Sequence, residues 1–451
     1  DGEEDSYLSA IFKDSAYIDT MEIRFEYPWK RYFIKVETAD DKNNWVAVAD
    51  YTVEGIEGSP VHIPISKVCK SVKISFLNKP GAQNPQCGSC SFTKLFIAMR
   101  LRKIWLLCNL VCIIPGAFAQ QFIHPGVLHS EKSLERIKRL VDQKAQPAYG
   151  SYEILAKLPE ARADYQMKGP FEIISRDGKY GYTKGPSERD FNSAYYNALL
   201  WKITGKKAHA DKSMEIIRAY ARTVRQIPPT NDAPLCAGLQ GFILVNAAEI
   251  MRYTYMETHY PNGWSEQDTE CVEAMFRKVF QPVLSKFFQT APYTNGNWGI
   301  AVAKAQLSFG VFLNDRKLYD DAIDFFYHGK DNGSLPNYIA ESGQSQEAGR
   351  DQQHVMLGVS CFADMAEVAW TQGDDLYGAL DNRIMKGYEY IAKSNLGYDV
   401  PFVKWKDITG KYSHLSTFGK EGMGRFRSVF EIAIIIMCCE KGWKCPIRKS
   451  F

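Results

Sequence analysis

The strongest constraint on the fold is a long succession of helix-length segments between residues 121 and 433. Within each segment the apolar side chains recur every three or four positions, which places them on one face of an α-helix. The segments are 130–141, 191–203, 212–223, 239–253, 267–289, 298–313, 317–327, 351–371 and 382–394. Successive helical hairpins bury such faces against one another. We therefore expect a mainly α fold, an (α/α) toroid built as an incomplete barrel of helical hairpins.

Capping residues support this division of the chain into helices. Ser130 precedes the first segment, where a hydroxyl accepts a hydrogen bond from an otherwise unpaired N–H group. Gly205 follows the segment 191–203 and is suited to the left-handed backbone that ends many helices.

Residues 1–98 have a different pattern, in which apolar and polar residues alternate. The clearest runs are 21–26, 32–37 and 71–76, and the turn-rich stretch 40–44 separates two of them. Alternation with a period of two is typical of half-buried strands, so we expect a small N-terminal β-sandwich fragment. Its cysteines, which allow a disulfide without fixing the pairing, are Cys69, Cys87 and Cys90.

Residues 99–119 read as a secretory signal peptide within the chain. Met99 begins a basic stretch, an apolar run follows from Ile104 to Phe118, and the small residues Ala117 and Ala119 flank a cleavage site. The apolar run is shorter than the roughly 20 residues of a membrane span. We expect that two neighbouring exported proteins are joined here, that the helical domain comprises residues 120–433, and that it is periplasmic or secreted, with no membrane attachment after signal removal.

The tail from 434 to 451 breaks the helical pattern. It holds three of the chain's 11 cysteines and a Lys- and Trp-containing run that suits neither a helix nor a turn. Codons chosen for this stretch and read one base out of phase give an ordinary helix that begins Tyr-Asn-His-Tyr. We therefore expect a single-base deletion near Ala433, with residues 434–451 as a frameshifted tail.

Composition narrows the function. Hydrophobic residues make up 45% and charged residues 24%, as in ordinary globular proteins. A net charge of +3 lacks the strong basic surface of nucleic-acid-binding proteins, so no nucleic-acid partner is expected. The aromatic content of 13% suits sugar rings as well as ordinary cores.

Two stretches carry more polar groups than helix packing requires. The first, residues 293–299, contains Asn297 and Trp298 at the entrance to an apolar helix, where N–H groups favour anions. A capping Asn beside a packed Trp is the alternative. The second is residues 341–354, in which Arg350 and His354 lie four apart and would share one face of a helix. An arginine beside an imidazole suits an acidic sugar, because Arg pairs with a carboxylate and His accepts a proton. A solvated helix start is the alternative here.

Other chemistries lack their motifs. The sequence has no P-loop, no H-E-x-x-H and no paired C-x-x-C motifs, and its eight histidines are scattered. We therefore expect neither a metal site of histidines nor a cofactor.

Residues 121–433 resemble the alginate-lyase superfamily of polysaccharide lyases, in the form found in gut Bacteroidetes, which have an (α/α) toroid fold. The resemblance rests on the stretches 201–206, 247–252, 295–299 and above all 341–354. Residues 1–98 resemble a partial discoidin-like (factor 5/8 type C) carbohydrate-binding module, through residues 1–4, 33–37, 43–45 and 72–76.

The resemblance implies β-elimination in a uronic-acid polymer, with alginate as the first expectation. Asn297 and Arg350 would hold the sugar carboxylate, His354 would act as the base, and Tyr412, or else Tyr338, as the acid. The superfamily often has an Asn-His pair where this chain has Asn297 and Trp298, which makes His354 the better base here. Further candidates for contacts with the acidic polysaccharide are Gln346, Glu347 and Tyr338. Four candidate sugar platforms also suit core packing: Trp298, Gln240, Tyr195 and Tyr196.

Two other functions remain open at this point. An (α/α) toroid glycoside hydrolase needs two carboxylates, for which Glu341, Glu347 and Asp351 are candidates. A non-catalytic protein that binds acidic glycans would need no acid or base.

Overall fold

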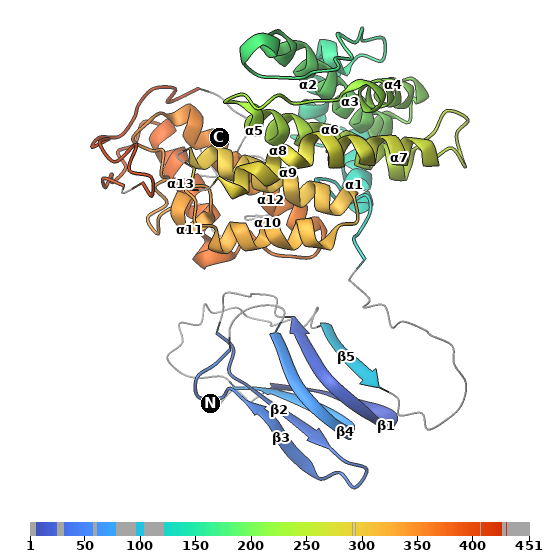
Figure 1. Cartoon of the computed structure of the whole chain (residues 1–451), viewed down its shortest axis with the longest axis vertical. Coiled ribbons are helices and arrows are strands. Elements are labelled where there is room, and N and C mark those ends of the chain that lie inside the picture. Colours follow the sequence, from blue (N-terminus) through green and yellow to red (C-terminus); the bar gives the residue numbers. More distant parts are fainter. Residues whose placement is uncertain are drawn as a thin grey trace. The chain divides into compact units, whose positions relative to one another are not determined.

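The computed structural model describes residues 6–24, 31–56, 61–77, 96–102, 121–290, 292–293, 295–405, 407–425 and 430. The chain divides into two compact units, Asp1–Ala117 and Phe118–Phe451 (Figure 1). Residues 103–119 and 434–451 lie outside the described residues, so the expected signal peptide and frameshifted tail stay predictions.

The described part of the first unit is one antiparallel sheet in the order β3-β2-β4-β1-β5 (Figure 1). Its strands are β1 (Ser6–Arg24), β2 (Ile34–Ala39), β3 (Trp45–Asp50), β4 (Val61–Phe76) and β5 (Phe96–Arg102). The three runs of alternating residues recognised in the sequence fall on β1, β2 and β4. β5 includes Met99, the expected first residue of the signal peptide, which pairs with Met21 of β1.

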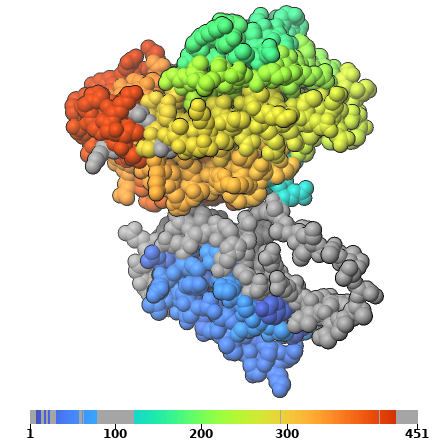
Figure 2. All heavy atoms as spheres, in the orientation of Figure 1, coloured from blue at the N-terminus to red at the C-terminus, as the bar shows by residue number. Residues whose placement is uncertain are grey.

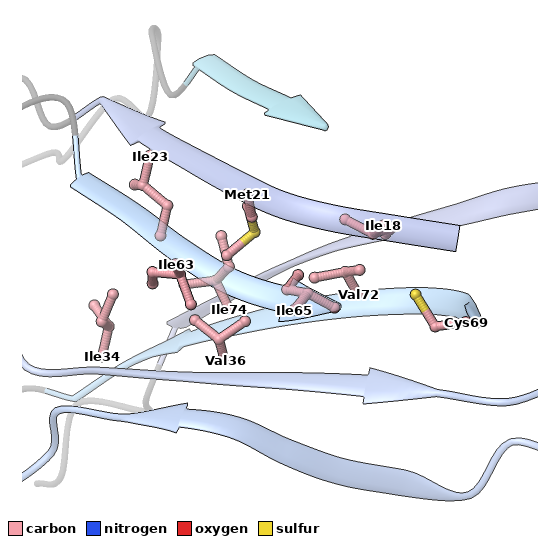
Figure 3. Close-up of a cluster of buried hydrophobic side chains, with 10 residues drawn as sticks. All are labelled: Ile18, Met21, Ile23, Ile34, Val36, Ile63, Ile65, Cys69, Val72 and Ile74. Carbon is pink, nitrogen blue, oxygen red and sulfur yellow. The ribbon is translucent and has the colours of Figure 1, made fainter. Parts of the chain in front are cut away.

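Alternate residues of β1, β2 and β4 form the core of this unit. Figure 3 shows side chains such as Met21, Val36 and Ile74 pointing into one cluster, and all three are almost completely buried. Alternate residues of the expected strands are thus buried, as in half-buried strands, although the described residues form one sheet and not the two sheets of a sandwich. Cys69 lies in the same cluster with a free thiol, and its expected partners Cys87 and Cys90 lie outside the described residues.

The second unit is the expected (α/α) toroid of helical hairpins (Figure 1). Its described helices are α1 (Glu131–Asp142), α2 (Ala148–Lys157), α3 (Lys184–Thr204), α4 (Lys207–Thr223), α5 (Ala233–Leu235), α6 (Gly241–Thr254), α7 (Glu266–Met275), α8 (Gln281–Gln289), α9 (Gly296–Phe312), α10 (Arg316–His328), α11 (Leu335–Tyr338), α12 (Gln352–Thr371) and α13 (Ala379–Asn395). Both expected caps are present. The Ser130 hydroxyl accepts from the Ser133 N–H, and Gly205 has a φ of 68°.

Two π-helical turns modify the expected helices. The expected segment 267–289 is helical throughout, but the π-turn Phe276–Phe280, which the sequence pattern did not predict, divides it into α7 and α8. A second π-turn, Cys236–Gln240, precedes α6. The span Ala233–Thr254 is long and apolar enough to cross a membrane, but 83% of its most apolar window is buried inside the protein. Packing in the core accounts for that apolar character.

Helix α9 is the centre of the toroid. All of its residues, from Gly296 to Phe312, are buried, and it packs against α6, α10 and α12. Lys304 of α9 forms an ion pair of 2.6 Å with Asp364 of α12, and its ammonium group lies 4.1 Å from the centre of the Phe242 ring. These contacts hold the middle of α9 against α12 and α6.

The segment after α13 covers the starts of both helices. Atoms of residues near 300 and near 410, yellow and red in Figure 2, adjoin one another. Asn332 donates to Asp407 (2.6 Å), and the Gly419 N–H donates to the Ala348 carbonyl (2.9 Å). Residues distant in the sequence therefore meet at this end of the helical unit.

Candidate active site

Three segments meet where α9 and α12 begin. Residues 295–298 start α9, residues 338–354 lead from α11 into α12, and residues 407–412 follow α13. Hydrogen bonds between side chains join all three segments. The polar stretches recognised at 293–299 and 341–354 are thus parts of one site.

Asp351 and His354 form a carboxylate–imidazole pair at the start of α12. Asp351 is the N-cap, and its Oδ1 accepts the N–H groups of Gln353 and His354, both at 2.9 Å. The other oxygen, Oδ2, lies 2.6 Å from His354 Nδ1. The His354 side chain is 35% exposed and that of Asp351 is 12% exposed. The Asp351 carboxylate therefore holds one side of the imidazole, and the ring remains partly exposed to solvent.

Arg350 lies in the turn before α12, so the expectation that it shares a helical face with His354 is wrong. Asp351 connects the two instead, because its Oδ2 is also 3.6 Å from Arg350 Nε. Arg350 Nη1 donates to Glu347 (3.0 Å) and to Asn295 Oδ1 (3.3 Å). The guanidinium remains 27% exposed and can still bind an anion.

Tyr412 stands beside this guanidinium. Its ring centre lies 5.4 Å from Arg350 Cζ, and its hydroxyl donates to Asn295 Oδ1 (2.7 Å). The Tyr412 N–H donates to Asp407 (2.7 Å), which holds the segment in place. Partial burial raises the pKa of Tyr412, although Arg350 opposes this shift. The phenol therefore keeps its proton at neutral pH, as an acid must.

Glu347 is a buried centre behind the exposed groups. Its carboxylate accepts hydrogen bonds from the Tyr338 hydroxyl (2.9 Å), from the N–H and side-chain amide of Asn297 (both 3.3 Å) and from Arg350. Burial raises the pKa of Glu347, while Arg350 and the Tyr338 hydroxyl act in the opposite direction. Glu347 thus positions the groups around it.

Asn297 is not available to a substrate in this structure. It is fully buried, and its amide nitrogen faces Glu347. Its Oδ1 has no hydrogen-bond partner among the described residues. In this structure the Asn297 side chain therefore supports Glu347, and its expected role in holding a sugar carboxylate stays a prediction.

Asn295 is the amide that the sequence reasoning missed. Its oxygen accepts from both Arg350 and Tyr412, which leaves its amide nitrogen as a donor on a half-buried side chain. Asn295 is also the N-cap of α9, although its side chain makes no capping hydrogen bond. The signal available in the sequence was an Asn directly before an apolar helix, within the polar stretch 293–299.

Several expected sugar contacts lie in the core instead. Trp298 is 7% exposed, and its ring stacks on Tyr293 at 5.3 Å with an angle of 21°. Gln240 is buried and donates to Ser187. Tyr338 is fully buried, and Gln346 is 4% exposed. All four side chains are therefore buried, and for Trp298 and Gln240 this is the core-packing alternative given above.

Tyr195 and Tyr196 are half-buried. The Tyr195 hydroxyl lies 2.6 Å from His129 Nε2, and no hydrogen bond links it to the site residues among the described residues. Among the described residues, no group of three His, Cys, Asp or Glu side chains is placed to hold a metal ion.

The fold and the site can be compared with known proteins. The chain is similar to alginate lyase A1-III from Sphingomonas species A1, with 12% identity over 69% of this chain and 88% of that chain, at a TM-score of 0.51. A tyrosine variant of alginate lyase A1-III complexed with a tetrasaccharide is similar to the same degree, with 12% identity, 69% and 87% coverage, and a TM-score of 0.52. These likenesses show the toroid fold.

A further likeness is to CpGH89CBM32-4 from Clostridium perfringens, with 24% identity over 18% of this chain and 60% of that chain, at a TM-score of 0.16. Comparison with curated proteins gives no match. The profile of the alginate lyase family matches residues 143–398, which is more than half of the chain and includes α9, α12 and the site residues up to His354. The protein therefore belongs to the alginate lyase family of polysaccharide lyases.

Proposed function

We propose that the protein cleaves a uronic-acid polymer, alginate first, by β-elimination. The observation that carries the proposal is the grouping of a half-exposed imidazole, a guanidinium and a protonated phenol at the starts of α9 and α12. The family supports the reaction class, and the tetrasaccharide bound by a similar lyase supports an acidic polysaccharide as the substrate.

Each exposed group suits one step of the elimination. Arg350 and the amide nitrogen of Asn295 bind the sugar carboxylate, which makes the neighbouring C5 proton more acidic. His354 removes that proton through Nε2. Tyr412 donates its proton to the departing O4, so that a C4–C5 double bond forms as the glycosidic C4–O bond breaks. Tyr412 suits this role because its pKa is raised.

The glycoside hydrolase alternative has weaker support. Its reaction needs two carboxylates that face the sugar about 5–10 Å apart. The Glu341 side chain is 89% exposed and faces Arg383. Glu347 is buried among hydrogen-bond donors, and Asp351 is occupied by the helix start and by His354. These three carboxylates therefore do not form a pair that faces a common sugar position.

Export and glycan binding complete the proposal. The signal-like segment 99–119 supports a periplasmic or secreted location. The discoidin-like pattern of residues 1–98 supports a role of the β unit in binding carbohydrate.

A panel of acidic polysaccharides tests this function. The chain as it stands, and a version with the reading frame restored from Ala433, are incubated with mannuronate-rich alginate, guluronate-rich alginate, glucuronan and glycosaminoglycans. We expect ultraviolet absorbance from an unsaturated product with at least one polymer. New reducing ends without this absorbance would indicate a hydrolase, and binding without turnover would indicate a non-catalytic glycan-binding protein.

A further inference from the structure

We infer that Asp351 is the positioning residue that holds His354 in the tautomer protonated at Nδ1 and so leaves Nε2 free to accept the substrate proton. The inference rests on the proposed function for its catalytic consequence. The tautomer itself can be measured without any substrate.

The start of α12 fixes the Asp351 carboxylate in place. Oδ1 accepts two backbone N–H groups at 2.9 Å, so the side chain cannot rotate without losing the cap. This orientation directs Oδ2 at His354 Nδ1, at a distance of 2.6 Å. The same residue that begins the helix therefore sets the position of the imidazole three residues later.

The charge on Asp351 decides which atom carries the proton. Burial alone would raise the pKa of Asp351, but the hydrogen bonds from the His354 N–H and imidazole, with Arg350 nearby, lower it. An ionised carboxylate can only accept hydrogen bonds. The hydrogen between the two residues must therefore be on His354 Nδ1, and a neutral imidazole then has its lone pair on Nε2.

The free nitrogen faces the accessible side of the pair. The His354 side chain is about three times as exposed as that of Asp351, at 35% against 12%, and Nε2 has no hydrogen-bond partner among the described residues. The charged groups that act on this imidazole or on its partner Asp351 include Arg350 and Glu347. Arg350 forms ion pairs with both carboxylates, and among the described residues Asp351 is the carboxylate paired with the ring.

Asp351→Asn separates capping from tautomer control. Asparagine is as good an N-cap as aspartate, so α12 should remain intact. The amide of Asn, however, can donate to Nδ1 and so favour the tautomer protonated at Nε2. Asp315→Asn is the matched control, because Asp315 caps α10 through the Leu318 N–H (3.2 Å) with no imidazole partner.

The variants are compared by kcat on the best polymer, by thermal unfolding, and by ¹⁵N NMR of the histidine rings, with His354→Ala to assign the signal. We expect Asp351→Asn to lower kcat about 10²–10⁴-fold, the usual contribution of a positioned base, with little change in Tm. Its His354 signal should move from the Nδ1–H to the Nε2–H pattern. Asp315→Asn should leave kcat and the His354 signal unchanged.

Two results would overturn the inference: an Nε2–H pattern for His354 in the wild-type protein, or wild-type kcat in folded Asp351→Asn. If Asp351→Asn does not fold, Asp351→Ser keeps a capping oxygen without the carboxylate, and the same readouts apply. A fully active His354→Ala variant would instead refute the proposed base, while the tautomer would still be decided by NMR.

Discussion

The Tyr412 hydroxyl donates a hydrogen bond of 2.7 Å to the side-chain oxygen of Asn295, a residue 117 positions earlier in the chain. Arg350 donates to the same oxygen from a third segment. One amide oxygen therefore aligns the phenol and the guanidinium. The shared oxygen brings the proposed acid and a cation together next to the start of α9.

His354→Ala should lower kcat about 10²–10⁴-fold without unfolding the protein, because the base is lost while the half-exposed ring carries little packing. Steady-state kinetics and circular dichroism measure the two effects. The control is His259→Ala, a similar loss at an exposed histidine in the loop after α6. Near-wild-type kcat in folded His354→Ala would assign the base to another group.

Arg350→Ala should lower kcat about 10²–10³-fold, because the guanidinium stabilises negative charge that develops near the sugar carboxylate. Arg350→Lys should recover little of it, since an ammonium group cannot contact Glu347, Asn295 and a sugar carboxylate in one plane. Kinetics of the three proteins provide the test. Full recovery by lysine would show that only charge matters at this position.

Asn295→Ala and Asn297→Ala should have different effects, although the residues are two positions apart. Asn295→Ala should mainly lower kcat, because Tyr412 and Arg350 lose the acceptor that aligns them. Asn297→Ala should mainly lower stability, by about 1–3 kcal/mol, because the buried Glu347 loses a donor. Denaturant unfolding and kinetics separate the two effects, with the exposed Asn231→Ala as control. The reverse assignment of effects would return Asn297 to the substrate site.

Trp298→Ala should destabilise the protein by about 3–5 kcal/mol, as expected for a buried aromatic residue, and should leave KM of the folded fraction nearly unchanged. The physical reason is the cavity left beside Tyr293, against which the indole packs. Denaturant titration measures the stability. A raised KM with unchanged stability would instead indicate a sugar platform.

Tyr412→Phe should lower kcat by removing the proposed acid. In the wild-type protein the acid must be protonated, and a pKa raised above the usual value of about 10 keeps it so through neutral and mildly alkaline pH. Activity that depends on this proton is present below the raised pKa and is lost only as the pH rises through it. The alkaline side of the pH profile of kcat is the test. If kcat already declines with rising pH at values well below ~9, this role for Tyr412 is contradicted.

Local pattern alone was enough to predict the helical class and most helix positions. Periodicity of apolar residues reports the buried face of a helix, and caps such as Ser130 and Gly205 depend on neighbours within a few residues. The stretch 341–354 stood out for the same local reason, because its polar residues lead directly into a buried helix. The π-turn at 276–280 escaped prediction, since its apolar pattern continues that of α7.

Tertiary structure alone decided which side chains face the site. Asn295 and Asn297 are the same residue type in the same short motif, yet only Asn297 is buried, because α9 is enclosed on all sides from Gly296 onward. Arg350 and His354 are joined by the Asp351 carboxylate and not by a shared helical face, because α12 begins at Gln352, two residues after Arg350. Burial and contacts between distant residues arise only when helices pack against one another. The spacing of residues within one segment therefore cannot predict them.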